Sequence, residues 1–325
     1  MAGLSEIQAA SWEYRDKTTA DFVADNIPLL YALREKKRVK VIDGGRVIWM
    51  NARVQQNQYV QRIDPTEEIA LGYNQTLTGF EYTPKIIVVP TVISDFEKAQ
   101  NQGDAKFLDL LNERNEIGEE SLMNAVEEDL QGDGTGYGGK ALAGVQTYIS
   151  TTPTIGSYGG ISRATYSSIQ NLAVDAPGTF TGSTDSSNIE SRLRYSRNAV
   201  YRSGGPQLCL AGLTYYNAAS DAMSAKRRFT RNEEMYKAGF DNVEIEGMTM
   251  VLAGGKVFSG LTRIAANRCY GLRLENFALM MYRNYNFQPV KDRVSLNQLV
   301  DVAISVGIGQ FCCSGSGLSF VMFDS

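Results

Sequence analysis

The residues most suggestive of chemistry form a glycine-rich run, Gly134–Lys140, that follows an acidic stretch. This run matches G-x-x-x-x-G-K, most of a phosphate-binding loop in which backbone N–H groups and a lysine hold phosphate oxygens. A working loop follows a strand and opens a helix, so that the helix N-terminus faces the phosphate. Here the element predicted before the run is a helix, and Ala141 stands where Mg²⁺ binding needs Ser or Thr. The run is therefore predicted to end a helix and turn the chain.

Acids just before this run raise a second possibility, a hydrolase that uses a carboxylate pair. Glu127 and Asp129, or Asp133, are the candidates. The sequence has no histidine, which removes the commonest general base, metal ligand and partner of a nucleophilic Ser or Cys. A carboxylate-based hydrolase and a soluble ligand-binding module built on the glycine run remain as alternative functions. We predict no enzyme, and no catalytic, cofactor-binding or metal-binding residue.

The four cysteines have no spacing typical of a metal site. Cys209, Cys269, Cys312 and Cys313 contain no C-x-x-C pair, and the adjacent two make a poor chelating or disulfide pair. Their apolar neighbours predict buried, reduced thiols.

The composition is that of a globular protein, with 43% hydrophobic and 21% charged residues in 325. The net charge of -4 gives no strong attraction to nucleic acid, so no sequence-specific DNA binding is expected. The N-terminus lacks a signal-peptide core, and no apolar run approaches the roughly 20 residues of a membrane span. We expect no membrane association.

One long helix is predicted to position the acidic stretch and the glycine run. It occupies the first two-thirds of 104–140, where apolar residues recur near helical spacing. A continuous β-rich run at 86–93 predicts a buried strand just before it. This apolar stripe of the helix consists of Phe107, Leu110, Leu111, Ile117, Leu122, Ala125, Val126 and Leu130.

Residues 39–82 are predicted to form a long two-stranded ribbon. A strand at 39–42 meets a turn at 43–45 and resumes at 46–50, and a second extended segment covers 69–82. A lone hairpin of this length is marginal in water. Another copy of the chain is the simplest partner for it.

The two ends and the middle of the chain complete the expected α+β organisation. Residues 1–38 are predicted to be two helical pieces, the second beginning near Ala20 with a possible kink at Pro28. The region 141–265 behaves as an inserted α/β unit. Residues 269–325 are predicted to be mostly strand, and the final apolar runs, at 300–308 and 311–323, to return to the sheet begun at 86–93.

The order of these features resembles the tailed-phage major capsid proteins of the HK97 fold. The local matches are the D-G-T-G-x-G-G-K turn at 133–140, the segments 142–145 and 150–153, and G-G-I-x-R-x-T-Y at 159–166, continuing to Asn171. The resemblance covers nearly the whole chain. It implies an N-terminal arm at 1–38, an extended loop at 39–82, a peripheral domain at 83–140 and 266–325 with a long spine helix, and an inserted axial domain at 141–265.

The resemblance also implies a function and partners. The chain would be a major capsid protein that assembles with itself, as pentamers and hexamers, into an icosahedral shell around double-stranded phage DNA. Assembly would take place in the host bacterial cytoplasm, and the protein would end in the virion. A separate scaffolding protein and a portal are the expected partners, because no long helical extension precedes the arm. The packaged DNA would be held without sequence specificity.

Function in such a protein consists of contacts between subunits, for which aromatic residues and arginine are the usual hot-spot types. For the aromatic candidates the alternative is ordinary core packing, and for the arginines it is a solvated helix surface. Arg194 and Arg197 could instead contact spine acids of a neighbour, namely Glu119, Glu120, Glu127 and Glu128. The predicted interface residues are Trp12, Tyr14, Trp49, Tyr59, Arg192, Arg194 and Arg197.

Some members of the family cross-link a lysine of the extended loop to an asparagine of a neighbour. The loop tip at 55–68 contains no lysine, and Lys40 lies near the loop base. Assembled particles boiled in denaturant should therefore run as single chains on a gel. A covalent ladder would contradict this prediction.

Overall fold

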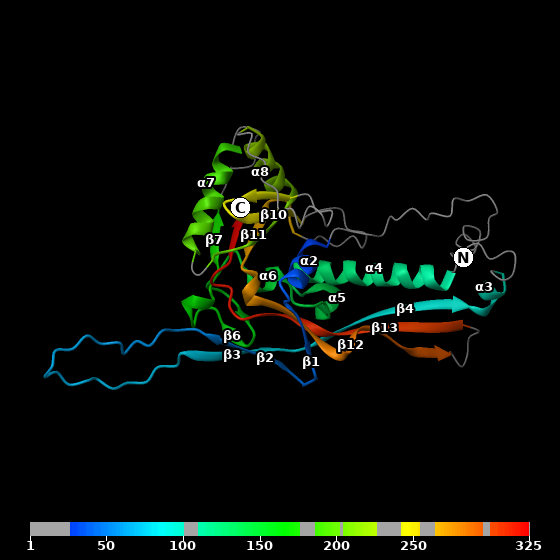
Figure 1. The fold of residues 1–325 in the computed structure, drawn as a ribbon, viewed down its shortest axis with the longest axis horizontal. Coiled ribbons are helices and arrows are strands. Elements are labelled where there is room, and N and C mark those ends of the chain that lie inside the picture. Colours follow the sequence, from blue (N-terminus) through cyan, green and yellow to red (C-terminus); the bar gives the residue numbers. More distant parts are fainter. Residues whose placement is uncertain are drawn as a thin grey trace.

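The structure is a computed structural model of the chain, and it describes residues 27–100, 110–175, 186–201, 204–225, 242–253, 264–294 and 300–324. Within these residues two sheets lie side by side, one below a long helix and the other beside a helix pair, while a hairpin projects away from both (Figure 1). The mixed helix and sheet confirm the predicted α+β class. Trp12 and Tyr14 lie outside the described residues.

The first sheet has four strands in the order β1-β12-β13-β4. β1 runs parallel to β12, and the other neighbours are antiparallel. The predicted pairing of the early strand with strands from the end of the chain is confirmed. The bounds are β1 Val39–Ile42, β4 Lys85–Ser94, β12 Phe277–Val294 and β13 Val300–Cys313.

The spine helix α4 covers residues Leu110–Gln131 and packs on β4, which the short helix α3 (Asp95–Gln100) follows. Of its predicted stripe, Leu122, Val126 and Leu130 are buried, whereas Ile117 is exposed. The position facing the strand there is Gly118, where an added Cβ would lie 3.4 Å from Thr91 Oγ1. The predicted helix start near residue 104 lies outside the described residues.

The second sheet has six strands in the order β7-β14-β11-β8-β10-β9. Helices α7 (Ser186–Ala199) and α8 (Leu213–Ala225) pack together beside it, around a core that includes Ile189, Leu193 and Tyr215. The strands are β7 Leu172–Asp175, β8 Leu208–Ala211, β9 Asn242–Ile245, β10 Met248–Leu252, β11 Arg268–Leu272 and β14 Phe320–Phe323.

One prediction about the terminal strands is wrong. The whole run at 311–323 was expected in the sheet of β4, but its last part, β14, pairs with β11 and β7 in the six-stranded sheet. The apolar run at 311–323 is split between two sheets because β13 ends at Cys313 and the chain turns before Phe320. The predicted boundary at 265/266 therefore does not coincide with the division between the sheets.

The paired strands of the projecting ribbon are also shorter than predicted. β2 (Ile48–Arg53) pairs with β3 (Leu77–Tyr82), whereas β1 leaves the ribbon and joins the four-stranded sheet. Gly44 and Gly45 adopt positive φ angles of 137° and 133° at the change of direction. Beyond the strands, the side chain of Gln61 bonds both the N–H and the C=O of Ala70.

Several short elements connect the two sheets. A two-stranded piece follows the glycine run and two short helical turns. The elements are α5 Gly136–Gly139, α6 Val145–Tyr148, β5 Ser157–Tyr158, β6 Ile161–Ser162 and the 3-10 turns η2 Ser167–Ile169 and η3 Leu274–Asn276.

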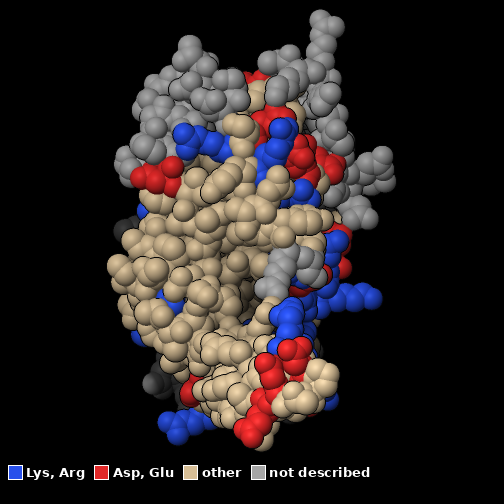
Figure 2. All heavy atoms as spheres, turned by 90° about the vertical axis from the view of Figure 1, so that its left-hand side faces the viewer, with Lys and Arg blue, Asp and Glu red and all other residues tan. Residues whose placement is uncertain are grey.

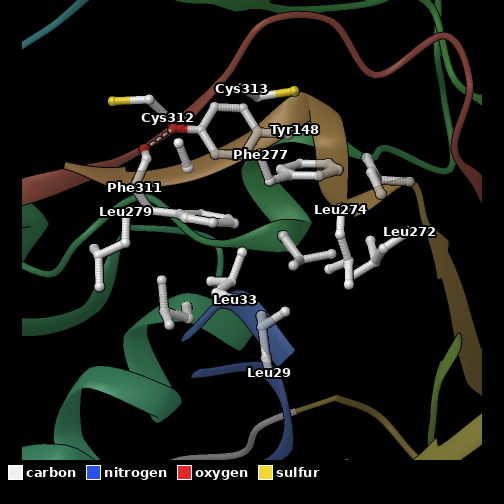
Figure 3. Packing of buried hydrophobic residues seen from close by; sticks show 14 of the residues in the cluster. Leu29, Leu33, Tyr148, Leu272, Leu274, Phe277, Leu279, Phe311, Cys312 and Cys313 are labelled. Carbon is white, nitrogen blue, oxygen red and sulfur yellow. Dashed lines mark hydrogen bonds between the residues drawn. The ribbon is translucent and has the colours of Figure 1, made fainter. Parts of the chain in front are cut away.

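Helix α2 (Pro28–Glu35) belongs to the core of its own chain. Pro28 occupies the first turn rather than a kink, since its fixed φ and missing N–H suit a helix start. Leu29 and Leu33 are fully buried near α4, in the cluster that Figure 3 draws. Glu127 of α4 accepts hydrogen bonds from Leu29 N (2.9 Å) and Leu30 N (2.7 Å). This part of the predicted arm is therefore fixed to the spine.

Glu127→Gln should destabilise the unassembled chain by about 2 kcal/mol, because the amide offers one oxygen where two backbone N–H groups need acceptors. Glu119→Gln, at an exposed position of the same helix, is the matched control and should change little. Urea unfolding measures both. Equal midpoints for the two variants would contradict the capping role of Glu127.

Candidate functional site

The acids considered for catalysis bond backbone groups of their own chain. Asp133 Oδ1 accepts hydrogen bonds from Thr135 N (2.9 Å) and Thr135 Oγ1 (2.7 Å). Asp129 Oδ2 accepts one from Leu142 N (3.0 Å). With Glu127 holding α2, each of the three carboxylates stabilises a local turn or helix start. The geometry gives no support to the alternative hydrolase.

The glycine run turns the chain, as predicted. Tyr137 and Gly138 adopt left-handed φ angles within α5, and Lys85 Nζ donates to Gly139 O at 2.6 Å. The run follows the C-terminal end of α4, where carbonyl groups and not N–H groups are exposed. Among the described residues, no group of three His, Cys, Asp or Glu could hold a metal ion. No helix within that part of the chain is long and apolar enough to cross a bilayer.

Within the part of the chain that the structure describes, one apolar face of the four-stranded sheet is not covered, and we call it the sheet face. Ile86, Val88 and Val92 of β4 are 62%, 49% and 45% exposed, while Val89 and Thr91 lie toward α4. Cross-strand partners share a face, so β13 adds half-buried residues opposite them. The residues of the sheet face are Ile86, Val88, Pro90 and Val92 with Val302, Ile304, Val306 and Ile308.

The prediction that the strand at 86–93 is buried is therefore wrong for one of its faces. A continuous apolar run is expected for a strand covered on both sides. The described residues of this chain cover only the α4 side of β4. Among the described residues, the apolar side chains on the other side of β4 remain exposed.

The ribbon carries a second set of exposed apolar side chains, which we call the ribbon surface. Leu71 and Tyr73 are 92% and 90% exposed near its tip. Trp49 lies over Gly79, and Tyr59 lies against Gly72, yet both aromatic rings remain exposed. Ordinary core packing does not account for Trp49 and Tyr59, and their role between copies stays a prediction. The full set is Trp49, Tyr59, Val60, Ile63, Ile69, Leu71, Tyr73 and Leu77.

The three arginines of α7 do not form one free exposed face. Arg194 is bound within its own chain, donating to Glu246 Oε1 and Glu190 Oε1 at 2.9 Å each. The guanidinium of Arg197 lies 5.1 Å from the ring centre of Tyr201 and is half-buried, as is Arg192. Contact of these residues with a neighbour is not tested by this geometry.

One part of the proposed arginine pairing is wrong. Glu127 and Glu128 were suggested as partners on a neighbouring spine, but they are 0% and 8% exposed. Glu127 lies on the α4 face that is turned toward α2, where it serves the backbone of that helix. Only Glu119 and Glu120 of the suggested acids remain accessible.

The sequence did not reveal a buried joint between the ribbon and the two sheets. Tyr82 OH donates to Cys313 O (2.5 Å), Tyr148 OH to Phe311 O, and Tyr158 OH to Ile169 O (3.0 Å). Figure 3 shows the ring of Tyr148 against the rings of Phe277 and Phe311, which stack on each other. We call these three tyrosines the tyrosine joint.

A buried cation supports the joint. Arg163 is 2% exposed and donates to Thr147 O (2.8 Å) and Tyr148 O (2.9 Å) at the end of α6. Its guanidinium also lies 4.8 Å from the ring centre of Tyr158. The segment around Arg163 is compositionally distinctive, but its partners are distant in sequence and carry no local signal.

A groove of about 1320 Å³ opens at the base of the ribbon. It is lined mainly by neutral polar residues, including Gln55, Gln56, Ser168 and Asn276. Figure 2, which looks toward the ribbon end, shows a broad uncharged area between charged groups at the top and bottom. This lining offers no acid-base pair for catalysis.

The fold is similar to that of proteins in solved phage capsids and in an encapsulin complex. No protein-family model and no curated protein sequence matches the chain. The cyanophage A-1(L) capsid matches at 15% identity with a TM-score of 0.69, over 95% of this chain and 96% of that one. The capsid of Myoviridae phage XM1 matches at 10% identity with a TM-score of 0.57, over 96% and 97%. An encapsulin complex of Synechococcus elongatus matches at 9% identity with a TM-score of 0.51, over 96% of both chains.

The chain has the HK97-type capsid fold. The predicted fold is thereby confirmed over nearly the whole sequence. The detailed assignment of arm, peripheral and axial domains stays a prediction.

The pKa of the Asp129 carboxyl group makes the stability of the folded chain depend on pH. Burial raises the pKa of its carboxyl group to about 6, whereas hydrogen bonds from Thr135 lower the pKa of Asp133. A raised folded-state pKa favours folding at low pH, and this contribution is lost as pH rises through about 6.

Asp129→Asn should therefore stabilise the unassembled chain at pH 7.5, by about 1 kcal/mol after allowance for partial exposure. The gain should vanish near pH 4. Asp133→Asn is the control of opposite sign, destabilising at neutral pH and less so in acid. Urea unfolding across this pH range tests both. A gain for Asp129→Asn that does not change with pH would contradict the assignment.

Proposed function

We propose that this chain is the major capsid protein of a tailed phage and assembles into an icosahedral shell around double-stranded DNA. The observation that carries the proposal is the likeness to the cyanophage capsid, at a TM-score of 0.69 over 95% of the chain. The sheet face and the ribbon surface supply a physical reason for assembly.

Each copy exposes two apolar surfaces. Monomeric proteins rarely leave contiguous apolar patches of large area in water. The ribbon points away from the four-stranded sheet, so it does not cover the sheet face of its own chain (Figure 1). In the proposal, the ribbon surface of one copy packs on the sheet face of the next.

A contact between two different surfaces is heterologous, and repeating it closes a ring when the rotation permits. Pentamers and hexamers are rings of this kind. The apolar area removed from water would drive assembly, at roughly 25 cal/mol per Å². Trp49 and Tyr59 would lie in this contact.

The remaining roles follow the predicted domain map. Residues 1–26 and their Trp12 and Tyr14 would reach a neighbour, while α2 anchors the arm to its own spine. The four-stranded sheet with α4 would form the peripheral domain, and the six-stranded sheet the axial one, with Arg192, Arg194 and Arg197 facing copies around the axis. A scaffolding protein and a portal would act during assembly in the host cytoplasm, and the shell would become part of the virion.

A second shell function follows from the similarity to the encapsulin of Synechococcus elongatus. A shell of that kind would be formed from the same contacts. The two kinds of shell would differ in what they enclose, because a phage head holds DNA.

Electron microscopy of the expressed chain, alone and with a scaffolding protein encoded beside it, tests the proposal. Closed shells, rings or capsomers are expected, and particles recovered from infected cells should contain nuclease-protected DNA. A monomer under all these conditions would contradict shell assembly. Shells that enclose protein and exclude DNA would favour the second function.

Leu71→Asp should prevent particle formation while leaving the folded chain intact, because Leu71 is almost fully exposed in one copy. A charge would be buried without a partner in the proposed contact. Leu71→Met, which retains the apolar side chain, is the control and should assemble. Particle yield by sedimentation and circular dichroism of the unassembled chain are the measurements. Normal yield of particles from Leu71→Asp would contradict a role for the ribbon tip.

A further inference from the structure

Two cysteines far apart in sequence meet inside the six-stranded sheet. Cys209 lies on β8 and Cys269 on β11, which are antiparallel neighbours. Cys209 pairs with Gly271, and Cys269 is two positions before Gly271, so both side chains lie on the same face. Their Sγ atoms are 2.9 Å apart, and both residues are fully buried.

This separation is intermediate between bonding and ordinary contact. A disulfide bond is about 2.05 Å long, whereas unbonded carbon atoms in contact stay about 3.5–4.0 Å apart. Because Cys209 and Cys269 are diagonal neighbours in the ladder, the strands must shift and the side chains turn for the sulfurs to reach bonding distance. Cys312 and Cys313 are different, because their side chains point to opposite sides of β13 (Figure 3).

The apolar environment of the two thiols slows their oxidation. The two residues belong to an apolar cluster with Ile189, Tyr215 and Phe320. Burial raises the pKa of Cys269, which leaves little reactive thiolate. Once formed, a disulfide here would be equally shielded from reductants. Reaction in either direction would require a small reagent or local opening of the sheet.

We propose that Cys209 and Cys269 are a latent disulfide, present as thiols in a reducing compartment and closed by a small peroxide in an oxidising medium. One thiol reacts with hydrogen peroxide to give a sulfenic acid and water. The second thiol displaces hydroxide from that sulfur, and a second water leaves as the S–S bond forms. Two electrons pass from the thiols to the peroxide. The bond closes a loop of 60 sequence positions that contains α8, β9 and β10.

The test treats the full-length chain with hydrogen peroxide, unfolds it with an alkylating agent present, and measures intact mass and digested peptides. The expected product has lost the mass of two hydrogen atoms and yields one cross-linked peptide pair containing Cys209 and Cys269. Its melting temperature should rise by about 3 °C or more, because the closed loop restricts the unfolded chain.

Matched variants distinguish this pair from general oxidation. Cys312→Ala should retain the cross-link, and Cys209→Ala should lose both the cross-link and the thermal shift. Two separately alkylated cysteines after treatment of the natural chain would overturn the proposal. So would oxidation of these residues to sulfinic acid, or a cross-link to Cys312 or Cys313.

Discussion

Strand β13 leaves the four-stranded sheet at Cys313, and the chain enters the six-stranded sheet only at Phe320, so the crossing between them must be held in place. The tyrosine joint binds the carbonyl groups of Phe311 and Cys313 at this point. The side chain of Gln310 also holds the crossing. Its Oε1 accepts a hydrogen bond from Ala143 N (2.9 Å), and its Nε2 donates one to Thr83 O (3.1 Å). Buried polar groups are costly without partners, so these bonds favour one arrangement of the crossing.

The same joint fixes the direction of the ribbon. Phe80 and Tyr82 of β3 are buried, and the ring of Phe80 stacks on Tyr158 with centres 5.3 Å apart. Glu81 N donates to Gly159 O at 2.9 Å, and Ser168 Oγ donates to Val54 O at 2.5 Å. A ribbon held at its base presents the ribbon surface with little loss of freedom on binding. Such preorganisation favours association.

The sequence predicted the features that depend on local pattern. The spine helix and the glycine stop after it follow from periodicity and turn residues. Patterns of this kind do not tell which sheet a strand joins, and β14 was misplaced for that reason. Nor do they distinguish a strand that is buried on both faces from one whose apolar residues remain exposed on one face, as in β4.

The candidate site was only partly predictable for a related reason. Trp49 and Tyr59 were selected by residue type, and the structure leaves both exposed. The partners of Arg163 and Tyr148 are distant in the chain, so no local sequence pattern predicts these contacts. The acids at the end of α4 resembled a catalytic group in sequence, yet each is used by nearby backbone.

In the proposed assembly, the ribbon surface of one copy covers the sheet face of another. A chain carrying Leu71→Cys and a chain carrying Val88→Cys can be mixed, assembled and treated with a flexible bis-maleimide, since the four native cysteines are buried. If this contact forms, cross-linked pairs that contain one chain of each kind should appear in particles and be absent before assembly. Particles that assemble normally and give no mixed pair would contradict it.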